Sequence, residues 1–312
     1  MTMPPVDILI ANYNGREALE LCIESIAAYT PEPHRVVVHD DGSTNPGDME
    51  YLSRARERGW VHELIDGGPQ QPLPPPSGPR HPSLAAIRHG MSLNALIGGV
   101  DPETDHVVLM DNDVYVRQRG WLTSLLASGK TSSDVLGVFD SRTRGFWPRG
   151  YHPASYSEWF GLLNMRAYRD GMGIDWAKGA ADRKEEPYLS YFSDIYPPES
   201  NATFRASLAG GWSRKEFDED LVILDPGATL WIKVMFENPK SYRVILPLAM
   251  QRGLYHHWGC AQQWLNPELD KPGNDPRPTP DRPWGEYGRK QHVKYKTIVT
   301  EELERFRRSQ RP

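Results

Sequence analysis

The sequence has few cysteines and no long apolar run. Its 312 residues include only two cysteines, Cys22 and Cys260, which are too few for a disulfide framework or a cysteine-built zinc site. No apolar segment approaches the ~20 residues that a membrane-spanning helix needs, and the N-terminus lacks the basic and apolar pattern of a secretion signal. We therefore expect reduced thiols and a soluble, cytoplasmic protein without a transmembrane segment.

A strong excess of positive charge is also missing. The formal net charge is −5, and no long run of lysine and arginine precedes the C-terminal tail. This composition disfavours a nucleic-acid partner, because proteins that bind nucleic acid present broad basic surfaces to phosphates. Hydrophobic residues make up 38% of the chain and charged residues 25%, which is enough apolar material for a globular core. The length favours one elaborated α/β domain.

Strand-like and helix-like segments alternate in the first third of the chain. Short apolar runs predict buried strands at 6–11, 35–39, 61–65 and 106–110. Apolar residues at three- and four-residue spacing predict helices between them at 17–29, 49–58 and 83–98. A strand, a helix and a strand in succession form a parallel pair with a right-handed crossover. The pattern predicts an α/β fold with a mostly parallel central sheet flanked by helices, and the very apolar fourth strand should lie at its centre.

Two proline-rich stretches interrupt this alternation. Residues 66–82 contain almost no apolar side chains, which predicts a loop or a mobile flap. Residues 267–283 are similar and should separate the globular body from a last helix at 293–308.

Polar residues follow three of the predicted strands, at the point where each strand ends. These groups are Asn12-Tyr13-Asn14, Asp40-Asp41-Gly42-Ser43 and Asp111-Asn112-Asp113. Open α/β sheets bind ligands at the carboxyl ends of their strands, so we expect the four aspartates to converge at one edge. A bound cation or the hydrogen-bond donors of a ligand would stabilise such a cluster of like charges. The alternative is that these residues only cap helices and shape turns.

The order of these motifs resembles glycosyltransferase family 2, whose members have the GT-A fold. The resemblance rests on Ile-Ala-Asn-Tyr-Asn-Gly, Val-His-Asp-Asp-Gly-Ser-Thr-Asn and Val-Val-Leu-Met-Asp-Asn-Asp-Val, and it covers residues 1–130. It implies a Rossmann-like, mostly parallel sheet with an elaborated C-terminal acceptor half. It also implies a half that binds the sugar nucleotide at 1–130, an acceptor-binding and catalytic half at 131–265, and a linker with a C-terminal helix at 266–312.

The resemblance assigns a role to most polar residues of the first half. Asp40 or Asp41 should meet the nucleobase or ribose, and Asp111 and Asp113 should face ribose and a divalent metal through an Asp-x-Asp motif. Carboxylate oxygens suit Mn²⁺ or Mg²⁺, and the diphosphate would supply further ligands. The other residues expected to contact the nucleotide are Ala11, Asn12, Tyr13, Arg88 and Asn112. Arg88 would reach the diphosphate, although the asparagine usual beside it is His89 here, and an exposed helix arginine is the alternative.

The resemblance also places a general base in the second half. Asp225 is the positional match for the acidic residue that deprotonates the acceptor hydroxyl in inverting members. The expected Glu-Asp pair is absent, since Leu224 precedes Asp225 and Pro226 follows it. Asp-Pro-Gly equally describes a helix N-cap, and Glu219 and Asp220 are alternative bases.

Two weaker assignments concern a third metal ligand and the acceptor. Of the adjacent residues His256 and His257, at most one imidazole should reach the metal, because neighbours on an extended chain point to opposite sides. We favour His257 of the two, and an ordinary core or surface histidine is the alternative. Tyr156 and Trp159 lie in an aromatic-rich segment that would either stack on the acceptor or form a small hydrophobic core.

Together these features predict a metal-dependent, inverting hexosyltransferase that moves one sugar from a nucleoside diphosphate sugar to an acceptor hydroxyl. The resemblance makes a UDP-sugar the favoured substrate, and a glycan or a small molecule is the favoured acceptor. The alternatives are a nucleotidyltransferase and a catalytically inactive protein that binds sugar nucleotides with the same fold.

Overall fold

The fold is that of a computed structural model, which describes residues 5–69, 84–129, 135–137, 160–173, 176, 242–244, 254–256 and 284–311. The chain divides into two compact units. The first contains Met1–Gln70, Met110–Leu126 and Pro247–Pro312, and the second contains Gln71–Leu109 and Ala127–Leu246.

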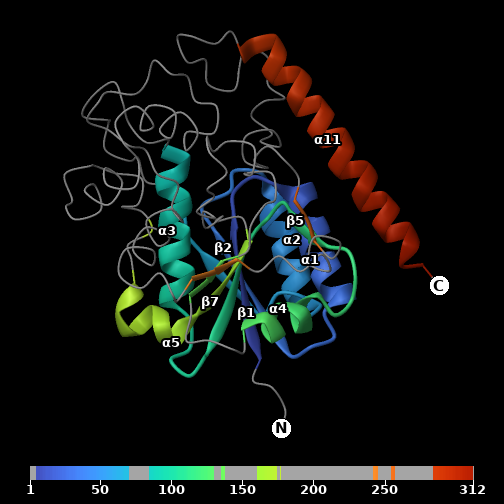
Figure 1. Cartoon of the computed structure of the whole chain (residues 1–312). Helices are drawn as coiled ribbons and strands as arrows, with labels where there is room; N and C mark the ends of the chain where they lie inside the picture. Colours follow the sequence, from blue (N-terminus) through green and yellow to red (C-terminus); the bar gives the residue numbers. More distant parts are fainter. Residues whose placement is uncertain are drawn as a thin grey trace, which may run out of the picture. The chain divides into compact units, whose positions relative to one another are not determined.

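The first unit begins with three parallel strands and two helices (Figure 1). The strands are β1 (Val6–Asn12), β2 (His34–Asp40) and β3 (Glu63–Asp66). All of β1 is buried, and Val6 pairs with His34 and Asn12 with Asp40, so β1 and β2 end side by side. The register therefore brings the polar ends of both strands to the same edge, as the sequence predicts.

Helix α1 (Arg16–Tyr29) follows β1 and carries a wide buried stripe. The buried apolar residues of this stripe are Ala18, Leu19, Leu21, Cys22, Ile23 and Ile26. Their three- and four-residue spacing is the reason that the helix is readable in the sequence.

Helix α2 (Pro46–Glu57) begins three residues before the predicted start at residue 49. The Asn45 side chain caps it by accepting a hydrogen bond from the Gly47 N–H at 3.1 Å, and Pro46 occupies the first turn. The predicted boundary was wrong because the apolar spacing begins only at Met49, whereas Asn-Pro is itself a helix-start signal.

The second unit contains α3 (Leu84–Gly98), most of β4 (His106–Asp111), and the elements β6 (Val135–Gly137), β7 (Phe160–Asn164) and β8 (Tyr242–Val244). After β7 come the short helices α5 (Met165–Ala167) and η2 (Tyr168–Met172). The Arg169 guanidinium donates to the backbone carbonyls of Asp101 and Pro102 at 2.8 and 2.6 Å, which ties η2 to the turn after α3.

Seven strands form one sheet in the order β3-β2-β1-β4-β7-β6-β8. Strands β1, β2 and β3 are parallel to one another, β6 is parallel to β8, and β6 is antiparallel to β7. Strand β4 is fourth of the seven and its four inner residues are buried, as its apolar sequence predicts. The predicted α/β fold with a mostly parallel central sheet flanked by helices is confirmed.

The first unit also contains β5 (Val114–Val116), β9 (Leu254–His256), most of the helix α4 (Trp121–Gly129) and the helix α11 (Trp284–Ser309). Helix α11 is the long helix at the C-terminus in Figure 1. It begins at Trp284 and not at 293 as predicted, because Gly285 and Gly288 have poor helix propensity and conceal its first turns. Within the described residues, no helix combines the length and apolar character needed to cross a bilayer.

Candidate sugar-nucleotide site

Three buried polar side chains connect the ends of β1, β2 and β4 in the first unit. The Asn112 amide donates to Asn12 Oδ1 at 2.7 Å, and Asn12 Nδ2 donates to Asp40 Oδ1 at 2.7 Å. Asn12 and Asp40 are each 1% exposed and Asn112 is 4% exposed. We call Asn112, Asn12 and Asp40 the strand-end relay. Each member forms a hydrogen bond with another member, so the relay joins three segments that lie up to 100 residues apart in the sequence.

The loop after β2 closes on the Asp40 carboxylate. The backbone N–H and the hydroxyl of Ser43 donate to Asp40 at 2.8 and 2.6 Å. Gly42 lies between them at φ 73°, a left-handed conformation that lets the chain turn back toward Asp40. With the bond from Asn12, this makes three hydrogen bonds to one buried carboxylate. The Asp40 side chain therefore holds the strand ends and the loop after β2 together.

The loop after β1 is fastened to the same turn through Asn14. Its backbone N–H donates to Ser43 Oγ at 2.9 Å, and its Oδ1 accepts from the N–H groups of Thr44 and Asn45 at 2.8 and 3.0 Å. Asn14 is fully buried and has φ 49°, a left-handed conformation that asparagine tolerates better than most residues. Sequence reasoning gave Asn14 no role of its own, although an Asn-Gly pair is a turn signal that could have identified it.

The polar side chains at this edge that remain partly exposed are different ones. Tyr13, Asp41 and Asp111 are partly exposed, whereas Ala11 is buried. The structure thus distinguishes two residues that are adjacent in the sequence. Asp40 is buried in the strand-end relay, whereas Asp41 is partly exposed beside it.

Asp113 lies 4% exposed against helix α1, close to the Cys22 thiol. Burial, with the negative charges of Asp113 and Asp111, raises the pKa of Cys22 well above its ordinary value. The sulfur is 3.8 Å from Met110 Sδ and 3.9 Å from the Asp111 carbonyl oxygen. Cys22 is therefore a neutral thiol packed beneath the Asp-x-Asp motif.

Strand β5 follows the motif and pairs with β9 in an antiparallel two-stranded sheet. Val114 lies opposite His256, so β9 ends beside the residue that follows Asp113. In the part of the chain that the structure describes, no three His, Cys, Asp or Glu side chains are arranged to hold a metal ion. Two motif carboxylates would need further ligands from another source, which a nucleotide diphosphate has available.

A second buried carboxylate lies near the frame, on the first turn of α2. Asp48 is 0% exposed, and within the described residues no side chain donates a hydrogen bond to its oxygens. Burial, then the charges of Asp40 and Glu17, raise its pKa to about 7, although the Gly15 N–H and Arg16 oppose the rise. The sequence offered no signal for it, because an aspartate in the first turn of a helix is the ordinary partner of the helix dipole.

Several predicted site residues belong to the second unit or lie outside the described residues. Arg88 is partly exposed on α3 in the second unit. The residues outside the described part of the chain are Tyr156, Trp159, Glu219, Asp220, Asp225, His257 and Cys260.

No family model and no curated protein sequence matches the chain significantly. Among solved structures, it is similar to TarS from S. aureus, with 14% identity and a TM-score of 0.38 over 55% of this chain and 30% of TarS. It is also similar to mouse xyloside xylosyltransferase 1, with 12% identity and a TM-score of 0.41 over 77% of this chain and 85% of that chain. A third similar structure is glucosyl-3-phosphoglycerate synthase from Mycobacterium tuberculosis with Mn²⁺, UDP and phosphoglyceric acid, at 15% identity and a TM-score of 0.36. The match covers 52% of this chain and 56% of the synthase, so the chain spans under a third of TarS and just over half of the synthase.

Proposed function

We propose that this protein is a metal-dependent, inverting glycosyltransferase of the GT-A type that takes a nucleoside diphosphate sugar, with UDP as the favoured nucleotide. The observation that carries the proposal is the strand-end relay, which fixes the Asp-x-Asp motif beside the loops after β1 and β2. A preformed polar edge at the carboxyl ends of parallel strands is the usual place for a nucleotide in an open α/β sheet.

Within this site we divide the residues into frame and contacts. Asn12, Asp40 and Asn112 form the frame, because their hydrogen bonds are made to one another. Tyr13 and Asp41 would contact the nucleobase and ribose, since they are partly exposed at the same edge. Asp41 is thereby preferred to Asp40 as the residue that meets the nucleoside.

Asp113 and Asp111 would hold Mn²⁺ or Mg²⁺, with the diphosphate and His257 as further ligands. Their carboxylates suit these hard cations, and β9 ends at His256 opposite Val114, next to Asp113 in the paired sheet. The bound cation would offset the negative charge that accumulates on the departing nucleoside diphosphate. Asp113 would hold the cation in a fixed position, because its own side chain lies buried against α1.

The acceptor half completes the proposal. Asp225 would take the proton from the acceptor hydroxyl as its oxygen attacks the anomeric carbon from the face opposite the nucleotide, so that the configuration inverts. Arg88 would bind the diphosphate, and Tyr156 and Trp159 would stack on the acceptor. The division into halves at 1–130 and 131–265, followed by the segment 266–312, is part of the same proposal.

Calorimetric titration with UDP tests the nucleotide site directly. We expect binding that depends on Mn²⁺ and is weakened by EDTA. Asp113→Ala should weaken it by at least the ~10–100-fold that loss of an outer-shell partner costs a metal site. The control is Glu57→Ala, which removes an exposed carboxylate from α2 in the same unit. Equal UDP affinity in Mn²⁺ and in EDTA would exclude the metal role.

Product analysis separates the transferase from its alternatives. A transferase should slowly hydrolyse a UDP-sugar to UDP and free sugar when Mn²⁺ is present and no acceptor is supplied. A nucleotidyltransferase should form a UDP-sugar from UTP and a sugar phosphate, releasing pyrophosphate. An inactive binding protein should do neither and still bind UDP.

A further inference from the structure

Helix α11 packs along α1 in the first unit, although the two helices are separated by most of the chain. Val299 packs on Ala18, and Leu303 packs on Leu21 and Tyr115. Near the C-terminal end of α11, the Phe306 ring meets Tyr29 edge to face, with centroids 5.8 Å apart.

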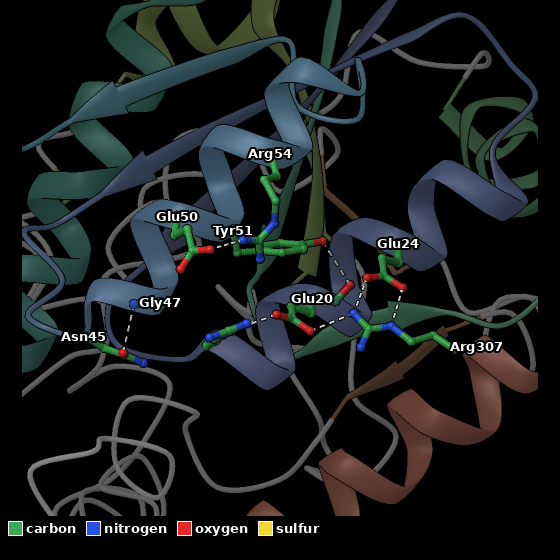
Figure 2. A network of polar contacts seen from close by, with 9 residues as sticks. Glu20, Glu24, Asn45, Gly47, Glu50, Tyr51, Arg54 and Arg307 are labelled. Carbon is green, nitrogen blue, oxygen red and sulfur yellow. Dashed lines mark hydrogen bonds and ion pairs between the residues drawn. The ribbon is translucent and has the colours of Figure 1, made fainter.

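A chain of ion pairs runs from α11 to the first residue of α1 (Figure 2). Arg307 bonds to Glu20 Oε2 at 2.7 Å and to Glu24 Oε2 at 2.9 Å. The other oxygen of Glu20 accepts from Arg16 Nε at 2.8 Å. The Glu20 side chain is only 7% exposed, so its buried negative charge is compensated by the ion pairs with Arg307 and Arg16.

Arg16 directly follows the loop after β1, which contains Tyr13 and Asn14. Its guanidinium lies over Gly47 in the first turn of α2, so close that a Cβ on Gly47 would stand 2.5 Å from Arg16 Nη1. The ion-pair chain therefore ends between the loops after β1 and β2, which frame the candidate site.

A second contact reaches the segment that follows the Asp-x-Asp motif. The Tyr115 hydroxyl donates to the Glu302 carboxylate of α11. Tyr115 is the central residue of β5 and lies two residues after Asp113. The same segment is held to α1 by the Val116 N–H, which donates to Ser25 Oγ at 2.9 Å.

We infer that α11 positions the sugar-nucleotide site, with Arg307 and Glu302 as its positioning residues. Arg307 acts through Glu20 and Arg16 on the loop after β1, and Glu302 acts through Tyr115 on β5, which begins directly after Asp113. The inference rests on the proposed function for its ligand, and it adds a dependence of nucleotide and metal affinity on the far end of the sequence.

Binding linkage gives the inference a reciprocal consequence. If the docking of α11 favours the geometry that binds UDP and Mn²⁺, then UDP and Mn²⁺ must favour the docking of α11 by the same factor. Backbone amides at 299–309 should therefore exchange with deuterium more slowly when both ligands are bound.

The test measures UDP affinity in Mn²⁺ for the double variant Arg307→Met with Glu302→Ala in the full chain. We expect affinity to fall by about five- to fiftyfold, within the usual range of coupling between sites. Glu302→Gln alone should keep most of the wild-type affinity, because its amide oxygen still accepts from the Tyr115 hydroxyl. Arg308→Met is the matched control, since Arg308 is 64% exposed on the same helix and pairs only with Glu304 in the described residues.

A stability control separates positioning from general loosening. Val61→Ala removes a buried side chain two residues before β3 and should lower the melting temperature without weakening UDP binding. An α11 double variant that binds UDP as tightly as wild type would overturn the inference. So would a Val61→Ala variant of equal melting temperature that loses as much affinity.

Deuterium exchange of the ligand-free protein keeps the test independent of the proposed function. Faster exchange of residues 12–20 and 111–116 in the double variant supports positioning, and unchanged exchange overturns it. If the wild-type protein binds no UDP in Mn²⁺, the proposed function fails, and the exchange result still decides the role of α11.

Discussion

The buried carboxyl of Asp48 should make the stability of the protein depend on pH in an uncommon direction. Its pKa is raised from an ordinary value of 3.8 to about 7, chiefly by burial and then by Asp40 and Glu17. Between these two values the folded protein holds a proton that the unfolded chain has released. The free energy of unfolding therefore decreases as pH rises through this window, and the full loss of stability is reached above pH 7.

Asp48→Asn removes this titration while keeping the size of the side chain. The amide brings a packing cost or gain that does not change with pH, so the informative quantity is the change in its effect between two pH values. A pKa of about 7 in the folded protein against 3.8 in the unfolded chain predicts that the variant gains about 2.5 kcal/mol over wild type on going from pH 5 to pH 8.

Urea unfolding at pH 5, 6.5 and 8 measures this gain. The control is Glu50→Gln, which removes an exposed carboxylate from the same helix and involves no burial. A gain for Asp48→Asn that is equal at all three pH values, or that shrinks as pH rises, would refute the reasoning. It would mean that the Gly15 N–H and Arg16 keep the carboxylate ionised at low pH.

Three further predictions concern single residues. Asn14→Ala should lower the free energy of unfolding by about 2–4 kcal/mol in urea unfolding, because it leaves the two N–H groups of residues 44–45 without their acceptor and puts alanine at positive φ. Asn14→Gly should lower the free energy of unfolding by less, and equal losses in the two variants would show that positive φ causes no backbone strain at this position. In a Cys260→Ser background, the Cys22 thiol should react with a thiol reagent only after unfolding, since burial raises its pKa; fast native reaction would contradict the packing. Asp225→Asn should lower turnover by about 10²–10⁴ while UDP affinity in Mn²⁺ and the melting temperature stay unchanged; near-normal turnover would make Asp225 a helix cap.

The sequence predicted those parts of the fold that depend on local patterns. Strand β1 and helix α1 follow from apolar runs and spacing, and both are found within one residue of their predicted bounds. Helix α11 was placed nine residues too late, because its early turns lack an apolar stripe and include glycines. Its packing on α1 comes from contacts across some 280 residues, which no local pattern reveals.

The sequence predicted which polar residues form the candidate site, but not which of them are buried in the strand-end relay and which remain partly exposed. Asp40 and Asp41 are equivalent in a sequence pattern. Only the hydrogen bonds from Asn12 and Ser43 distinguish them, and the bond from Asn12 spans 28 residues. Asp48 was missed for the same reason, since its burial depends on how α2 packs and not on its neighbours in sequence.

The strand-end relay restricts how the specificity of this protein can be changed. Asn12 accepts through one atom of its amide and donates through the other, so only one orientation of that group satisfies both Asn112 and Asp40. Replacing Asn12 by aspartate changes a single atom and sets two carboxylates against each other. A library that randomises positions 12, 40 and 112 would therefore consist mostly of misfolded variants, whereas one that randomises positions 13 and 41 leaves the hydrogen bonds of the strand-end relay intact. Among natural relatives, the same constraint would make positions 12, 40 and 112 change together or not at all, and would let positions 13 and 41 vary with the nucleotide that each relative uses.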